Sequence, residues 1–123
     1  MASILFVDDD ALTLKLLSQA AQILGHQALL ASSAEKALVQ AVEEKPDLVI
    51  TDVRLGGASG LDLLTQLREH PGTAHIPVIT LSALQTAEGD ALARERGAVA
   101  SLPKPVRLQT LLEVIGEYTQ VQH

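Results

Sequence analysis

Carboxylates follow two apolar runs of the chain. Each run ends directly in acidic residues: residues 3–7 lead into Asp8, Asp9 and Asp10, and residues 48–51 lead into Asp52. Short apolar runs that stop at polar residues or glycines are typical of strands buried on both faces of a parallel sheet. Ligands bind outside the carboxyl ends of such strands, and neighbouring strands would bring these acids to one rim.

Crowded carboxylates predict a divalent metal ion, because like charges repel one another and lose hydration unless a cation compensates them. Ligand sets made only of oxygen favour Mg²⁺, Mn²⁺ or Ca²⁺. An aspartate can also attack phosphorus and form an aspartyl phosphate. Two later strand ends carry Ser82 and Lys104, a hydroxyl and an ammonium group that could bind phosphoryl oxygens beside the metal. These residue types together indicate phosphoryl transfer.

Strands and helices alternate along the chain in the predicted order βαβαβαβαβα. The strands are expected at residues 3–7, 27–31, 48–52, 76–81 and 99–102, with a helix after each. Short connections and right-handed crossovers make this pattern a doubly wound parallel sheet of the α/β class. The strand at 27–31 has no polar residue at its end, so we expect it at an edge of the sheet, away from the site.

The helix ends carry their own signals. Asp10 is placed as the N-cap of the first helix, and Ser32 with Glu35 forms a capping box for the second. Gly89 weakens the fourth helix, predicted over residues 85–96, by about 1 kcal/mol relative to alanine. The last helix is expected to fray around Gly116.

Length and composition predict a single domain over residues 1–123, since this length is close to the commonest domain size and 47% of the residues are hydrophobic. A net charge of −6 argues against direct nucleic-acid binding. The chain has no cysteine and therefore no disulfide or thiolate ligand. Because no apolar stretch has membrane-spanning length and the N-terminus lacks the form of a signal peptide, we expect a cytoplasmic protein that contacts no membrane.

The chain resembles the receiver domain of two-component response regulators (CheY-like) along essentially its full length. Five elements in order carry the resemblance: Val7-Asp8-Asp9, Asp52 after its strand, Ser82-Ala83, Gly97-Ala98 and Lys104-Pro105. It implies a flavodoxin-like (βα)5 three-layer sandwich with a five-stranded parallel sheet of order 2-1-3-4-5. It also implies a phosphoacceptor signalling domain that catalyses only its own phosphoryl transfer and dephosphorylation.

The resemblance assigns a role to each residue of the metal site. Asp9, Asp52 and the backbone carbonyl of Arg54 would bind Mg²⁺ directly, with Mn²⁺ as a possible substitute, while Asp8 would act largely through water. Asp52 would accept the phosphoryl group from a sensor histidine kinase or a phosphotransfer protein.

The remaining implications concern the phosphoryl oxygens and the partners. Ser82 and Lys104 would contact those oxygens, and the Lys104–Pro105 peptide bond would be cis. An output domain or effector protein would respond to phosphorylation. A homodimer could form through the face made by the fourth helix, the fifth strand and the last helix.

Two positions depart from the family pattern. Gly56 stands where receivers usually carry a proline, which we expect to loosen that loop without changing the chemistry. Ser101 stands where they usually carry a tyrosine or phenylalanine, which puts the usual relay to the output face in doubt.

By the family pattern, Arg54 and Leu84 would flank the phosphoryl group and slow its hydrolysis.

Two alternative functions remain open from the sequence. One is a phosphatase similar to haloacid dehalogenases, with Asp8 as nucleophile and Asp10 as general acid. Ala11-Leu12 follows where that class usually has Gly-Thr, and the further acidic pair is missing. The other is a receiver-like docking module that works without phosphorylation, for which Ser101 is the main support.

Overall fold

The sheet at the centre of the computed structural model brings the acidic strand ends together. The structure describes residues 2–55, 58–83 and 86–119. In this part of the chain a five-stranded parallel sheet is formed by β1 (Ser3–Val7), β2 (Gln27–Ala31), β3 (Leu48–Asp52), β6 (Val78–Ser82) and β7 (Ala100–Pro103). Its order is β2-β1-β3-β6-β7, which confirms the predicted 2-1-3-4-5 topology and places β2 at an edge.

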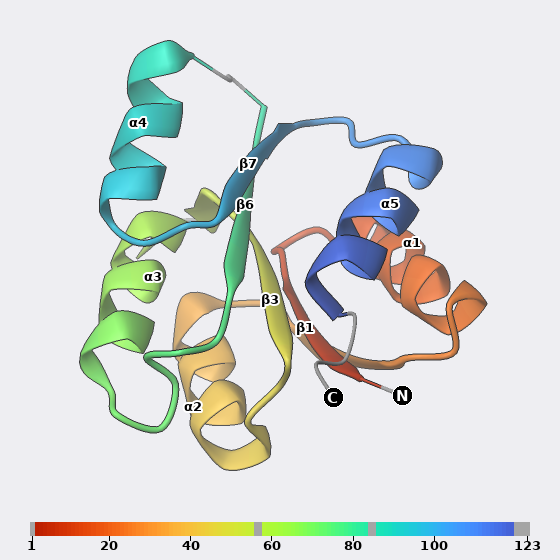
Figure 1. Cartoon of the computed structure of the whole chain (residues 1–123), viewed down its shortest axis with the longest axis horizontal. Coiled ribbons are helices and arrows are strands. Elements are labelled where there is room, and N and C mark those ends of the chain that lie inside the picture. The colour runs from red at the N-terminus through yellow and green to blue at the C-terminus, as the bar shows by residue number, and fades with distance from the viewer. Residues whose placement is uncertain (1, 56–57, 84–85, 120–123) are drawn as a thin grey trace.

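Helices cover both faces of this sheet and give the predicted three layers (Figure 1). One face carries α1 (Ala11–Ile23) and α5 (Leu108–Thr119), and the other carries α2 (Ala34–Glu44), α3 (Gly60–Glu69) and α4 (Ala87–Glu95). None of the described helices is long and apolar enough to cross a membrane.

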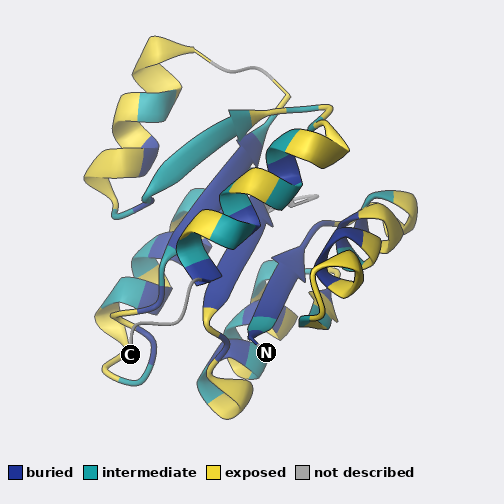
Figure 2. Ribbon diagram, turned by 45° about the vertical axis from the view of Figure 1, so that its right-hand side comes forward, coloured by how far each residue is buried: buried dark blue, intermediate teal, exposed yellow. Residues whose placement is uncertain are grey.

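The strands bury side chains on both faces. In β1, Ile4 and Phe6 belong to the core that includes α1 and α5, whereas Leu5 and Val7 belong to the core that includes α2 and α3. Every residue of β3 is buried. The central strands are accordingly drawn as buried in Figure 2, while β7 at the edge is only half-buried. Asp52 therefore projects from the rigid centre of the sheet.

The beginning of α2 and the end of α5 differ from the prediction. The second helix begins one residue later than expected, because the Ser33 hydroxyl, and not that of Ser32, accepts a hydrogen bond from the Lys36 N–H at 3.2 Å. The last helix does not fray at Gly116 but continues to Thr119. Spacing alone could not choose between two adjacent serines.

A hydrogen-bonded clasp explains why the last helix continues. The hydroxyl of Thr119 donates to the Ile115 carbonyl and lies 3.3 Å from His26 Nε2. His26 Nδ1 accepts the Ala2 N–H at 3.0 Å, so its Nε2 carries the proton of the neutral ring. The clasp therefore joins α5, the loop before β2 and the beginning of β1.

Helix α4 is held less firmly than the other helices. Its N-cap is Thr86, so the helix is shorter than the predicted 85–96. All residues of α4 are described, and Ala93 is the one that is buried. Figure 2 shows most of α4 as exposed. Few apolar contacts are typical of segments that rearrange easily.

A short antiparallel ladder follows β3 and was not predicted. It consists of β4 (Arg54–Leu55) and β5 (Ala58–Ser59), in which Arg54 pairs with Ser59. The ladder connects the end of β3 to the beginning of α3. The predictions made for Gly56 and Leu84 lie outside the described residues.

Candidate functional site

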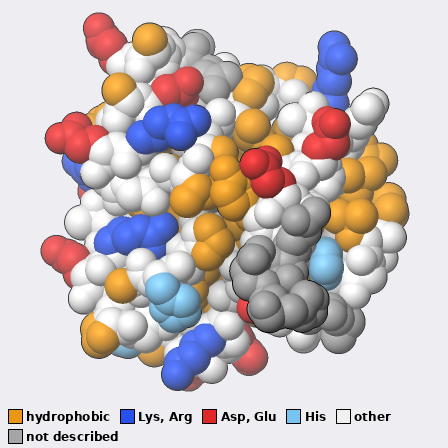
Figure 3. Space-filling model, viewed as in Figure 1, with side chains coloured by type: hydrophobic (Ala, Val, Ile, Leu, Met, Phe, Trp, Pro, Cys, Tyr) orange, Lys and Arg blue, Asp and Glu red, His pale blue; other side chains and the backbone are white. Residues whose placement is uncertain are grey.

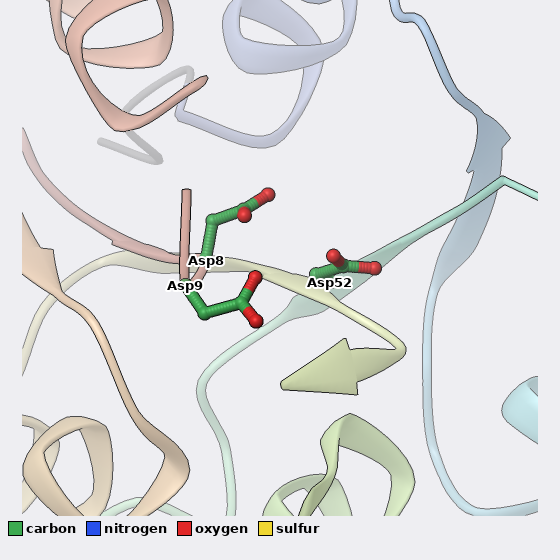
Figure 4. Close-up of side chains that lie close together, drawn as sticks. All are labelled: Asp8, Asp9 and Asp52. Carbon is green, nitrogen blue, oxygen red and sulfur yellow. The ribbon is translucent and has the colours of Figure 1, made fainter. Parts of the chain in front are cut away.

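Three carboxylates lie together at the carboxyl edge of the sheet, as predicted. Asp8, Asp9 and Asp52 each offer an oxygen, and these oxygens all lie within 4.8 Å of one another (Figure 4). Neighbouring strands cause this arrangement, since Val7 of β1 pairs with Thr51 of β3 and an aspartate follows each of these two residues in the sequence. Asp8 and Asp52 are buried, whereas Asp9 is exposed.

The Lys104 ammonium bridges the two buried carboxylates. Its Nζ lies 2.9 Å from Asp8 Oδ2 and 3.0 Å from Asp52 Oδ2. The backbone holds the lysine in place, because its N–H donates to the Ser82 carbonyl at 2.9 Å. The peptide bond from Lys104 to Pro105 is cis, as predicted. Burial alone would lower the pKa of Lys104, but the hydrogen bonds to Asp8 and Asp52 outweigh that effect and raise it above its usual value.

Backbone N–H groups orient the second oxygen of each buried carboxylate. Asp8 Oδ1 accepts the Asp10 N–H at 2.9 Å, and Asp52 Oδ1 accepts the Arg54 N–H at 3.2 Å. In each of these two carboxylates, one oxygen therefore accepts a backbone hydrogen bond and the other contacts Lys104. These contacts fix the carboxylates before any ligand arrives, which lowers the cost of ordering the site.

Asp10 belongs to α1 and not to the cluster. Its carboxylate accepts hydrogen bonds from the backbone N–H and the hydroxyl of Thr13, at 3.3 and 2.6 Å. The hydroxyl bond is the main reason that the pKa of Asp10 lies below its usual value. The structure thus confirms the prediction of an N-cap.

Ser82 and Lys104 share a cavity with Asp52. The cavity has a volume of about 140 Å³ and is lined by Asp52, Val53, Arg54, Ser82, Ala83 and Lys104. A volume of this size has room for roughly four water-sized groups, which is sufficient for a phosphoryl group. The hydroxyl, the ammonium group and the acceptor carboxylate predicted from the sequence therefore border one space.

Gly60 is a positioning residue that the sequence did not identify. A Cβ atom at this position would overlap the backbone carbonyl of Asp52. The Gly60 N–H donates to the Val53 carbonyl at 2.7 Å, while the Thr51 hydroxyl donates to the Asp52 carbonyl at 3.0 Å. Only glycine allows α3 to begin this close to the acidic strand end, and the glycine-rich stretch was the only signal.

The donor set of the cluster fits a hard divalent cation. Three carboxylates, one of them exposed, supply oxygen ligands of the kind that Mg²⁺ and Mn²⁺ prefer. The structure places the Arg54 N–H against Asp52. That the Arg54 carbonyl is a ligand stays a prediction.

The sequence matches the family model of the response regulator receiver domain over residues 4–116. The chain belongs to this family. A relative is the polar-differentiation response regulator DivK of Brucella ovis, 30% identical over 116 residues that cover 94% of each chain.

Solved receiver structures agree with this membership. A response regulator receiver domain protein from Clostridium thermocellum has a TM-score of 0.87 at 32% identity, covering 96% of this chain and 94% of that one. The chemotaxis protein CheY4 of Vibrio cholerae has a TM-score of 0.91 at 25% identity, covering 96% of this chain and 98% of that one.

As a receiver domain, the protein acts in two-component phosphorelay signalling. The docking-module alternative is not favoured, because the acidic cluster, Ser82 and Lys104 are all assembled at the strand ends. The phosphatase alternative needs Asp10 as a free general acid, and that carboxylate is engaged as the N-cap of α1.

Proposed function

We propose that Asp52 is the phosphoacceptor and that it receives the phosphoryl group from a phosphohistidine of a sensor histidine kinase or phosphotransfer protein. The observation that carries this proposal is the Lys104 bridge: the lysine lies 3.0 Å from Asp52 Oδ2, at the wall of a cavity that also contains Ser82. Among the three clustered acids, Asp52 borders this cavity. Family membership supports the same assignment.

The reaction forms one bond and breaks another. A carboxylate oxygen of Asp52 attacks the phosphorus, the phosphorus–nitrogen bond of the donor breaks, and its electron pair returns to the imidazole. The Lys104 ammonium lies close enough to donate a hydrogen bond to one phosphoryl oxygen, and the Ser82 hydroxyl can donate to another. The backbone bond from Arg54 keeps the acceptor oriented while these contacts form.

Asp9, Asp52 and the Arg54 carbonyl would hold Mg²⁺, with Asp8 acting through water. When bound, the ion neutralises negative charge that builds up on the phosphoryl oxygens. The buried Asp8 also keeps Lys104 next to Asp52 through its own 2.9 Å contact.

We also propose that the protein is cytoplasmic, as expected from its sequence.

Phosphorylation by a small donor tests the assignment. With Mg²⁺ and acetyl phosphate the protein should gain the mass of one phosphoryl group, and hydroxylamine should remove it. Asp52→Asn should abolish the gain, while Asp62→Asn, at an exposed aspartate of α3, should leave it unchanged. Equal labelling of the Asp52→Asn variant would show that another residue is the acceptor.

The face made by α4, β7 and α5 is our proposed output or dimer surface. Hydrophobic side chains gather along the middle of this face (Figure 3). Leu102 of β7 and Tyr118 of α5 are half-buried and pack against the core. Addition of beryllofluoride, a phosphoryl mimic, should change amide hydrogen exchange most in residues 86–96, because α4 is weakly anchored. Unchanged exchange there at full occupancy would contradict a switch carried by α4.

A further inference from the structure

A second cavity lies beneath α4, and no step of the proposed phosphoryl transfer uses it. This α4 cavity has a volume of about 160 Å³. Its walls come from the segment after β3, the first turn of α3, the end of β6, the N-cap and first turn of α4, and β7. The lining residues are Val53, Arg54, Leu61, Ser82, Thr86, Gly89, Asp90 and Ser101.

Small residues on opposite walls account for this space. Ser101 faces it from the sheet and Gly89 faces it from the helix. Among the described residues, and apart from its chain neighbours and the backbone of α4, only the Thr86 hydroxyl oxygen would lie within 4 Å of a Cβ atom added at Gly89, at 3.1 Å. Helix α4 contributes only Ala93 to the core, so it does not close the space with side chains of its own.

The sheet face toward α4 carries a row of hydroxyl-bearing residues, of which Ser101 lines the cavity. Thr51, Thr80 and Ser101 pair in register on β3, β6 and β7, and thus form a row on one face of the sheet. Thr80 is fully buried and is not among the residues that line the cavity, so Ser101 is the member of this row that a ligand would meet.

The chemistry of the walls defines what would fit. Val53 and Leu61 supply apolar surface, whereas Ser82, Thr86 and Ser101 supply hydroxyls and Asp90 supplies a carboxylate. A carboxylate accepts several hydrogen bonds and repels anions. A protein cavity of about 150 Å³ can hold benzene. These features together suit one aromatic ring that carries a hydrogen-bond donor.

We propose that the α4 cavity is a binding site for a phenol-sized ring supplied from outside the chain. The chain has one phenylalanine and one tyrosine and no tryptophan. Phe6 is fully buried in the core with α1 and α5, and Tyr118 of α5 packs against that same core. Neither ring is available to the α4 cavity, so the occupant is either a free phenolic compound or a tyrosine side chain of another protein.

The α4 cavity is positioned to influence the acceptor. It shares Val53, Arg54 and Ser82 with the cavity beside Asp52. A ring bound there would therefore contact the same serine that is proposed to meet the phosphoryl group. By reciprocity, any effect of the ring on beryllofluoride affinity must equal the effect of beryllofluoride on ring affinity. This coupling, unlike the binding itself, rests on the proposed function.

Titration with phenol tests the site in the unphosphorylated protein without Mg²⁺. Amide resonances of Val53, Leu61, Gly89 and Ser101 should shift saturably. Ser101→Phe should fill the cavity with its own ring and weaken phenol binding by roughly tenfold or more. Ser32→Phe, the same substitution at an exposed serine beside the opposite edge strand, should bind phenol like the wild type. Asp52→Asn should also bind normally, which separates this site from the phosphoacceptor.

A second variant keeps the proposal testable if Ser101→Phe does not fold. Leu61→Ala should enlarge the cavity and shift its preference from phenol toward the larger indole. Binding of N-acetyltyrosine amide in addition to phenol would identify a partner's tyrosine as the occupant, and binding of phenol alone would identify a free compound. Absence of saturable shifts, or equal phenol affinity in wild type and a folded Ser101→Phe, would overturn the proposal.

Discussion

Replacement of Lys104 by methionine should destabilise the fold far more than loss of an ordinary surface lysine. Lys104 is the cation that bridges Asp8 and Asp52 at 2.9 and 3.0 Å. Methionine keeps an unbranched apolar stem of similar length, so the substitution removes mainly the charge. The two carboxylates would then remain next to each other, nearly buried and without a compensating side chain.

The expected magnitude follows from the exposure of the three groups. Removal of one partner of a fully buried ion pair costs about 3–5 kcal/mol. The Asp8 side chain is 1% exposed and that of Asp52 is 11% exposed, but 22% of the Lys104 side chain reaches solvent. Solvent screening reduces the effect of such a pair, and we therefore expect a loss of about 2 kcal/mol in the free energy of unfolding.

Urea unfolding at pH 7 with a chelator present measures this loss. The raised pKa of Lys104 means that its stabilisation is fully present below the pKa of an unfolded lysine and disappears only as the pH rises through the folded value. Lys15→Met, at an exposed lysine of α1, is the matched control and should change stability little. The Lys104→Met variant should also gain more stability from Mg²⁺ than the wild type does. Equal unfolding free energies for Lys104→Met and Lys15→Met would refute the role of the bridge.

Three further substitutions probe other contacts. Gly60→Ala should slow phosphorylation by acetyl phosphate, because its Cβ must displace the Asp52 carbonyl; a normal rate would mean that α3 shifts without disturbing the acceptor. His26→Ala should lower stability by about 1–3 kcal/mol while phosphorylation of the folded protein continues normally, since the clasp lies at the opposite end of the strands. Arg54→Asn should accelerate loss of the phosphoryl group by opening the approach of water, and a slower loss would reject shielding by this residue.

The strands and their acidic ends could be predicted because the signals are local. The runs at 3–7 and 27–31 match β1 and β2, and the central run ends in Asp52 as expected. Parallel pairing then brings Asp8 beside Asp52 by register alone. Such an inference needs only side-chain pattern and the rule that ligands bind at the carboxyl ends of the strands.

The missed features depend on contacts between distant segments. Gly60 matters because α3 begins against the backbone of β3, and α5 passes Gly116 because its end meets His26 and the start of β1. The sequence contains the residues but not their distances. The bridge from Lys104 to two acids could be predicted in part. The position of Lys104 at a strand end was expected, but its contacts with both carboxylates were not.

Lys104, which contacts the proposed acceptor Asp52, follows β7, one of the two edge strands of the sheet. β3, which carries Asp52, is buried along its whole length, whereas no residue of β7 is fully buried. In the proposed phosphorylation of Asp52, Lys104 would exchange its contact with Asp52 for one with a phosphoryl oxygen. The resulting movement would reach a rim strand first, with little rearrangement of the hydrophobic interior. On this proposal, a partner that binds only at the edge of the sheet would sense phosphorylation at its centre.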